Sequence, residues 1–168
     1  RQLGASYRFF SCGLAFSLLG DVLLAIENGD LFVFGLGAFL IAHLFYIRSF
    51  MPICKRPDLS RLFAQVLYLT LGGLVFALLW PHLGELRLPV AVYMLVLLAM
   101  AMISLLSRQS NRWLILGAAC FVLSDSLIGI DKFYAPLPQA SLMIMLTYYA
   151  AQFFLFKGML QRSTLSPT

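Results

Sequence analysis

Two aspartates in this 168-residue chain, Asp21 and Asp125, each lie well inside a long apolar stretch. An ionised carboxylate in a hydrocarbon environment costs several kcal/mol unless it is paired or reached by water. Two carboxyl groups that face one cavity divide near neutral pH into one proton donor and one carboxylate, which is an arrangement suited to acid-assisted hydrolysis. The alternative is structural, with each aspartate hydrogen-bonding to a neighbouring helix.

Among the other polar side chains in the apolar stretches, four are candidates for a site: His43, Tyr93, Tyr148 and Gln152. A histidine in this setting can orient a water, donate to an ether or phosphate oxygen, or share a proton with an aspartate, although it can also simply bind a backbone carbonyl. Tyr148 lies too deep for the interfacial aromatic belt. Tyr93 and Gln152 are equally compatible with a site and with interhelical hydrogen bonds. One turn before Asp21, Ser17 is expected to serve close helix packing.

The sequence lacks the motifs of several common kinds of catalytic and binding site. There is no His-x-x-x-His or Glu-x-x-His pair, so we predict no metal site. Acid-assisted hydrolysis by two carboxyl groups also requires no organic cofactor. No Gly-x-Ser-x-Gly elbow and no nucleotide-binding glycine loop occurs. The three cysteines (Cys12, Cys54 and Cys120) are widely spaced and are interpreted as small packing residues.

The elements that must position these residues are membrane helices. The chain is 61% hydrophobic and only 11% charged, whereas about 25% of residues are charged in ordinary soluble domains. Six apolar segments approach the ~20 residues needed to cross a bilayer core. They are residues 7–26, 31–50, 62–80, 88–107, 113–130 and 139–157. We therefore predict an all-α, polytopic transmembrane helix bundle in which residues 1–168 form a single domain.

Basic residues are distributed unevenly between the two sides of the predicted bundle. The chain has 12 lysines and arginines, and only Arg87 and Lys132 fall on the side away from the chain ends. The positive-inside rule then places both ends of the chain in the cytoplasm. Because the basic residues flank the helices, they are interpreted as membrane anchors and not as a nucleic-acid patch.

The segment around Asp21 is repeated around Asp125. Residues 13–27 align without gaps on residues 117–131 with six identities in fifteen, and the two aspartates coincide. The following helices also correspond, with His43 opposite Gln152. An offset of four helices preserves orientation, which predicts two parallel four-helix repeats. Two further helices are then expected before Arg1, giving eight in the full-length parent protein.

At these polar positions the sequence resembles the lysoplasmalogenase (YhhN-like) family of membrane proteins. The matching strings are Gly20–Leu24 (GDVLL), Phe39–Tyr46 (FLIAHLFY), Pro89–Met94 (PVAVYM), Phe121–Asp125 (FVLSD) and Tyr148–Gln152 (YYAAQ). They occur in the family's order and cover nearly the whole chain. The resemblance also implies an eight-helix protein, the same number as the repeat.

The resemblance implies a hydrolase that cleaves the vinyl ether bond of lysoplasmalogens, single-chain lipids of the surrounding membrane, to a fatty aldehyde and a glycerophospho-alcohol. Asp21 and Asp125 would act as the proton donor and the carboxylate, in either order. The remaining site residues would orient water or the substrate's glycerol oxygens: His43, Tyr93, Tyr148 and Gln152.

Two alternatives stay open from sequence. A proton- or cation-coupled transporter built from parallel repeats explains the buried acids equally well, and a structural subunit would tolerate their loss. The aspartates are expected in the outer half of the membrane and His43 and Gln152 in the inner half, so a site that uses all four must cross the midplane. The compact loops suggest a bacterial inner membrane, whereas the oligomeric state and the headgroup preference are left open.

Overall fold

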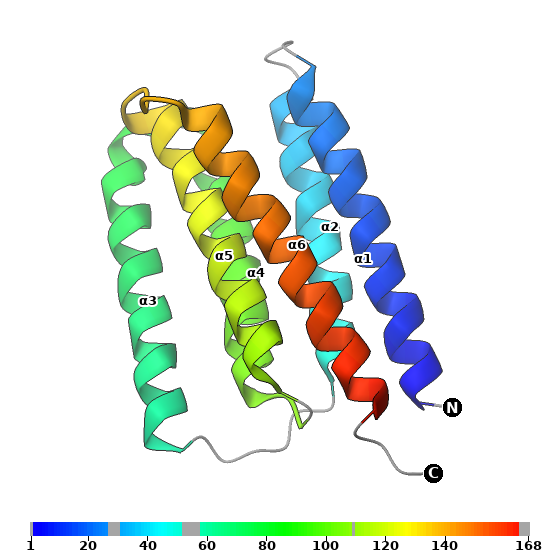
Figure 1. Ribbon diagram of the computed structural model, residues 1–168. Helices are drawn as coiled ribbons and strands as arrows, with labels where there is room; N and C mark the ends of the chain where they lie inside the picture. Colours follow the sequence, from blue (N-terminus) through cyan, green and yellow to red (C-terminus); the bar gives the residue numbers. More distant parts are fainter. Residues whose placement is uncertain (1, 27–30, 52–57, 109, 165–168) are drawn as a thin grey trace.

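The computed structural model describes residues 2–26, 31–51, 58–108 and 110–164, and all the regular elements in these ranges are helical. Six long helices follow one another along the chain (Figure 1). They are α1 (Gln2–Ala25), α2 (Phe32–Phe50), α3 (Leu59–Leu79), α4 (Arg87–Leu106), α5 (Arg112–Gly129) and α6 (Ala140–Thr164). Short η2 (Trp80–His82) and η3 (Gly84–Leu86) turns link α3 to α4, and the π-helix η4 (Ile130–Tyr134) continues α5.

The helices run alternately up and down, and both ends of the chain lie at the same end of the bundle (Figure 1). The hairpins α1–α2 and α5–α6 form the most extensive pairings, and α4 joins them by packing against α2, α3 and α5. In contrast, α1 and α6 touch each other only lightly. The bundle is therefore two tight hairpins held together through α4.

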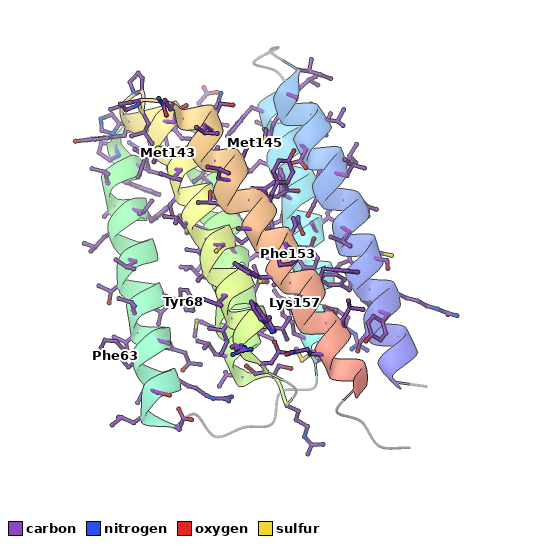
Figure 2. The ribbon with its side chains drawn as sticks, viewed as in Figure 1. Phe63, Tyr68, Met143, Met145, Phe153 and Lys157 are labelled. Carbon is purple, nitrogen blue, oxygen red and sulfur yellow. The ribbon has the colours of Figure 1, made fainter. Side chains whose placement is uncertain are left out.

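The outside of the bundle is apolar, as the composition predicts. Each of the six helices is long and apolar enough to cross a membrane. Figure 2 shows Phe63 on α3 and Phe153 on α6, and these side chains are 69% and 57% exposed. Exposed surface of this kind is suited to lipid contact. The prediction of a six-helix membrane bundle is confirmed.

Polar side chains fix the helix ends at the end of the bundle that carries the termini. Asp58 caps α3 by accepting from the backbone N–H of Arg61 at 2.9 Å. Asn111 caps α5 by accepting from two backbone N–H groups, and its Nδ2 donates to the Gly158 carbonyl of α6 at 2.9 Å. This second contact ties the start of α5 to the end of α6.

The predicted helix bounds need small corrections. The first, third and sixth segments extend further at the chain-end side than predicted, where basic and polar residues continue the helix beyond the apolar stretch. Residues 131–134, predicted as part of a connection, continue α5 as the π-helix η4. Asp131 and Lys132 therefore lie on the helical continuation of α5 and not in a loop.

Glycine contacts repeat between the two hairpins. A Cβ atom on Gly13 would lie 2.5 Å from the Tyr46 ring, and one on Gly117 would lie 2.8 Å from the Leu155 backbone nitrogen. Gly13 aligns with Gly117, and the His43–Gln152 correspondence aligns Tyr46 with Leu155. Equivalent glycines therefore admit equivalent neighbours from the following helix, which is what an internal repeat requires.

Candidate active site

Asp21 and Asp125 line one cavity of about 670 Å³. Asp21 stands four residues before the end of α1, and Asp125 stands four residues before the end of α5. Because α1 and α5 run in the same direction, both carboxyl groups lie at the same depth, towards the end of the bundle opposite the termini (Figure 1). The walls come from α1, α2, α5, η4 and α6, and both aspartates are partly buried. The arrangement that acid-assisted hydrolysis requires, two carboxyl groups facing one cavity, is therefore present, and the catalytic role of the pair stays a prediction.

A tyrosine hydroxyl contacts each aspartate. The Tyr93 hydroxyl on α4 donates a hydrogen bond to Oδ2 of Asp125. The Tyr148 hydroxyl on α6 lies close enough to the Asp21 carboxyl group to interact with it. Both tyrosines are buried, with 8% and 7% of their surfaces exposed. The two carboxyl groups are therefore held in place from two different helices.

From Asp21, hydrogen bonds continue towards the middle of the bundle. Gln152 Nε2 donates to the Tyr148 hydroxyl at 3.0 Å, and the Tyr46 hydroxyl donates to Gln152 Oε1 at 3.0 Å. The Ser17 and Tyr46 hydroxyls are 3.1 Å apart. Gln152 does not line the cavity but reaches it through Tyr148. This network links the depth of Asp21 to the depth of Gln152, as a site that uses both residues requires.

Tyr46 and Ser17 belong to this network, although sequence reasoning did not select them as site residues. The available signals were the position of Tyr46 three residues after His43 and that of Ser17 one turn before Asp21. Ser17 was interpreted as a packing residue. It is 1% exposed and does pack, but it also ends the hydrogen-bond chain.

His43 is fully buried behind the cavity wall. Its Nδ1 is 2.6 Å from the Phe39 carbonyl oxygen, and since a carbonyl can only accept, Nδ1 carries the hydrogen. Nε2 is then an acceptor, and it has no hydrogen-bond partner among the residues that the structure describes. The imidazole packs edge-on against Phe121 at 4.7 Å and Tyr93 at 5.5 Å between ring centroids. His43 therefore contacts the site through Tyr93 and does not line the cavity.

A second, smaller pocket of about 50 Å³ adjoins the first on the side of α3 and α4. Its lining is almost entirely apolar, with side chains such as Leu36, Val90 and Leu97. Asp125 lines both pockets. One carboxyl group thus stands where a polar cavity meets an apolar one.

Histidine, cysteine and carboxylate side chains do not form a group of three that could hold a metal ion in the described parts of the chain. Cys12 is exposed and Cys120 partly buried, and Cys54 lies outside the described residues. The groups that the cavity presents are therefore carboxyl, hydroxyl and ammonium groups.

Fold and site together define a polytopic membrane protein with paired carboxyl groups in an internal cavity. Residues 1–159 match the YhhN family, and the chain belongs to that family. No solved structure matches the chain.

Curated relatives carry the name lysoplasmalogenase. The chain is 38% identical to the Mycobacterium tuberculosis lysoplasmalogenase over 161 residues, covering 93% of this chain and 62% of that protein. It is 39% identical to human lysoplasmalogenase TMEM86B over 140 residues, covering 83% of this chain and 58% of that protein. Human lysoplasmalogenase TMEM86A is 37% identical over 151 residues, with 83% and 60% covered. The chain thus spans about three-fifths of the length of these relatives.

Proposed function

We propose that this protein is a lysoplasmalogenase, a membrane hydrolase that cleaves the vinyl ether bond of 1-alkenyl lysophospholipids. The observation that carries the proposal is the placement of Asp21 and Asp125 in one cavity, each contacted by a tyrosine hydroxyl. The names of the relatives support it. The products are a fatty aldehyde and a glycerophospho-alcohol.

The reaction begins with a proton transfer to carbon. One aspartic acid donates its proton to the β-carbon of the vinyl ether, and the double-bond electrons move to leave an oxocarbenium ion. The other aspartate stabilises this cation and takes a proton from the water that attacks it. The resulting hemiacetal collapses: its hydroxyl group loses its proton as the aldehyde C=O bond forms, the C–O bond to glycerol breaks, and the departing glycerol oxygen takes up a proton from the aspartate pair. After one turnover the pair again holds one proton, either on the aspartate that carried it at the start or on the other one.

The tyrosines and Gln152 hold the pair in this working arrangement. Tyr93 fixes Asp125, and Tyr148 fixes Asp21 while Gln152 donates to the Tyr148 hydroxyl. His43 packs against Tyr93 and keeps an acceptor nitrogen for a water molecule. Positioning of this kind within about 0.5 Å is what a proton transfer to carbon requires.

The substrate enters from the membrane. The proposed point of entry for a single-chain lipid is the α1–α6 side of the bundle, where these two helices touch only lightly. The apolar pocket beside Asp125 offers space next to the reacting bond for the start of the alkenyl chain. A lipid substrate therefore needs no route through water.

The test is aldehyde release from a 1-alkenyl lysophospholipid by the purified protein in detergent, with Asp21→Asn and Asp125→Asn measured in parallel. Glu85→Gln is the matched control, since Glu85 is an exposed acid at the same end of the bundle and outside the cavity. We expect release by the wild type and the control and a loss of at least a hundredfold in both aspartate variants. Wild-type activity in both aspartate variants would exclude this mechanism.

A transporter is the second candidate, and one observation favours it. The hydrogen-bond chain from Asp21 through Tyr148, Gln152 and Tyr46 extends along the bundle and can pass a proton. A transporter gives no product in detergent, where the protein has no second compartment. Absence of aldehyde together with proton-coupled flux in proteoliposomes would establish it.

We propose further that both ends of this chain face the cytoplasm of a bacterial inner membrane. The basic side chains gather at the end of the bundle that carries the termini, where Arg48 lies over the Phe9 ring and Lys157 over the Trp113 ring. Cations at that end are favoured by the positive-inside rule. Accessibility of single introduced cysteines to a membrane-impermeant reagent in spheroplasts tests the orientation.

A further inference from the structure

Two opposite charges line the cavity on the π-helix that continues α5. Asp131 and Lys132, on the π-helix that continues α5, line the same cavity as Asp21 and Asp125. The mechanism proposed above uses neither of them. Both lie at the end of the bundle opposite the termini, where a lipid headgroup would leave the membrane.

Each charge is held by its own neighbour. The Lys132 ammonium lies 4.3 Å from the centre of the Phe32 ring, and that ring also lines the cavity. Oδ1 of Asp131 accepts from the Leu137 backbone N–H at 2.8 Å, which fixes the carboxylate on the turn before α6. Among the described residues no ion pair joins Asp131 to Lys132. The cavity lining thus presents a cation and an anion that form no ion pair with each other.

The distance from this pair to the reacting groups fits the substrate. Lys132 follows Asp125 by seven residues, and seven helical residues rise by about 10 Å. In a 1-alkenyl lysophospholipid seven bonds of about 1.5 Å separate the alkenyl β-carbon from the phosphorus, a contour of about 10 Å. A lipid with its vinyl ether beside Asp125 therefore places its phosphate near Lys132.

We propose that Lys132 binds the phosphate and Asp131 binds the amine of a zwitterionic phospholipid headgroup. This inference rests on the proposed lysoplasmalogenase function. Lysine is a compact point charge suited to phosphate, and a carboxylate suits an ammonium group. A headgroup with phosphate but no amine leaves Asp131 facing a like charge, and a lipid without phosphate leaves Lys132 unused.

The experiment compares KM and kcat for aldehyde release from three substrates at a fixed mole fraction in a neutral detergent. They are the 1-alkenyl lysophosphoethanolamine, the 1-alkenyl glycerol phosphate and the 1-alkenyl glycerol. The variants are Lys132→Met and Asp131→Asn, whose amide oxygen can still accept from the Leu137 N–H. Arg87→Met is the matched control, because Arg87 lies at the same end, stacks on Trp80 and is outside the cavity.

Lys132→Met should raise KM about tenfold for the two phosphate-bearing substrates and leave the 1-alkenyl glycerol unchanged, as expected for loss of one charge-assisted contact. Asp131→Asn should raise KM for the ethanolamine lipid and lower it for the glycerol phosphate. In every case kcat should stay within about twofold, and Arg87→Met should match the wild type. Equal effects on all three substrates, or no effect on any, would overturn the headgroup assignment.

Binding of a non-cleavable 1-O-alkyl lysophosphoethanolamine, measured by calorimetry, separates the two proposals. If the wild type binds this analogue and Lys132→Met weakens binding about tenfold, the headgroup site holds even if no aldehyde is ever released. If aldehyde is released but neither Lys132→Met nor Asp131→Asn changes KM or binding, the hydrolase function is supported and the headgroup site is refuted.

Discussion

Removing the Tyr93 hydroxyl tests how the aspartates are held. Tyr93→Phe deletes the donor to Asp125 and keeps the ring, whose contact with His43 and 8% exposure are those of a packed residue. The prediction takes Asp125 as the carboxylate of the pair, and a hydrogen bond to a charged group contributes about 1.5–3 kcal/mol. If that bond acts in the transition state, kcat/KM should fall by about 10- to 150-fold. The protein should stay folded, because no cavity is created.

The assay is kcat/KM for aldehyde release, measured beside the thermal midpoint of unfolding in detergent. The matched control is Tyr149→Phe, since Tyr149 adjoins Tyr148 on α6 but is 62% exposed and outside the cavity. It should keep wild-type activity. An unchanged kcat/KM for Tyr93→Phe, within about twofold, would refute the view that this hydroxyl positions Asp125 for catalysis.

Two further predictions concern stability. Gly117→Ala should lower the thermal midpoint of unfolding by several degrees, because the new Cβ would lie 2.8 Å from the Leu155 backbone nitrogen. The control Gly73→Ala should not lower it, because a Cβ there meets open space, and equal midpoints for the two variants would contradict the packing argument. The backbone N–H of Arg61 holds the pKa of the Asp58 carboxyl below its usual range, so its contribution to stability is present above pH 4 or so and is lost as the pH falls through the folded-state value. The difference in midpoint between the wild type and Asp58→Asn should therefore be present at pH 6 and shrink as the pH falls below 4, and a difference that does not change with pH would show that the Asp58 charge is not responsible.

The fold was predictable because membrane helices depend on few signals. Length, apolar content and short charged connections are enough to place six spans, since lipid leaves the backbone almost no other way to satisfy its hydrogen bonds. The bounds were less predictable, because a helix does not end where the apolar stretch ends. The extension of α5 through Lys132 is the clearest case, since no composition signal separates a π-helical turn from a loop.

Candidate site residues could be predicted from the sequence because ionisable residues in apolar helices are rare and therefore stand out. Asp21 and Asp125 were selected because an ionised carboxylate in hydrocarbon is unfavourable, and the repeat placed them at equivalent positions in two helices. The cavity that both of them line is seen only in the structure. The pairing of Asp125 with Tyr93 was not predictable, because it depends on α4 packing between the two hairpins. The role of Tyr46 was missed for the same reason, since it depends on contacts between α1, α2 and α6.

The prediction that His43 and Gln152 belong to the site stays partly open. Gln152 joins Asp21 through Tyr148, which supports a positioning role. His43 Nδ1 donates a hydrogen bond to the Phe39 carbonyl of its own helix, which is the structural alternative given for this residue. Its other ring nitrogen, Nε2, is a buried acceptor. Gln152→Leu and His43→Phe, measured for kcat and for folding, separate these roles. We expect both to reduce kcat.

The most direct test of the central claim is the mass of the aldehyde released in D₂O. Protonation of the alkenyl β-carbon by an aspartic acid predicts one deuterium at C2 of the aldehyde, trapped immediately by reduction, and a slower rate in D₂O than in water. Asp21→Asn and Asp125→Asn should release no labelled product. Aldehyde without deuterium at C2, or labelled aldehyde released at the wild-type rate by both variants, would contradict the account.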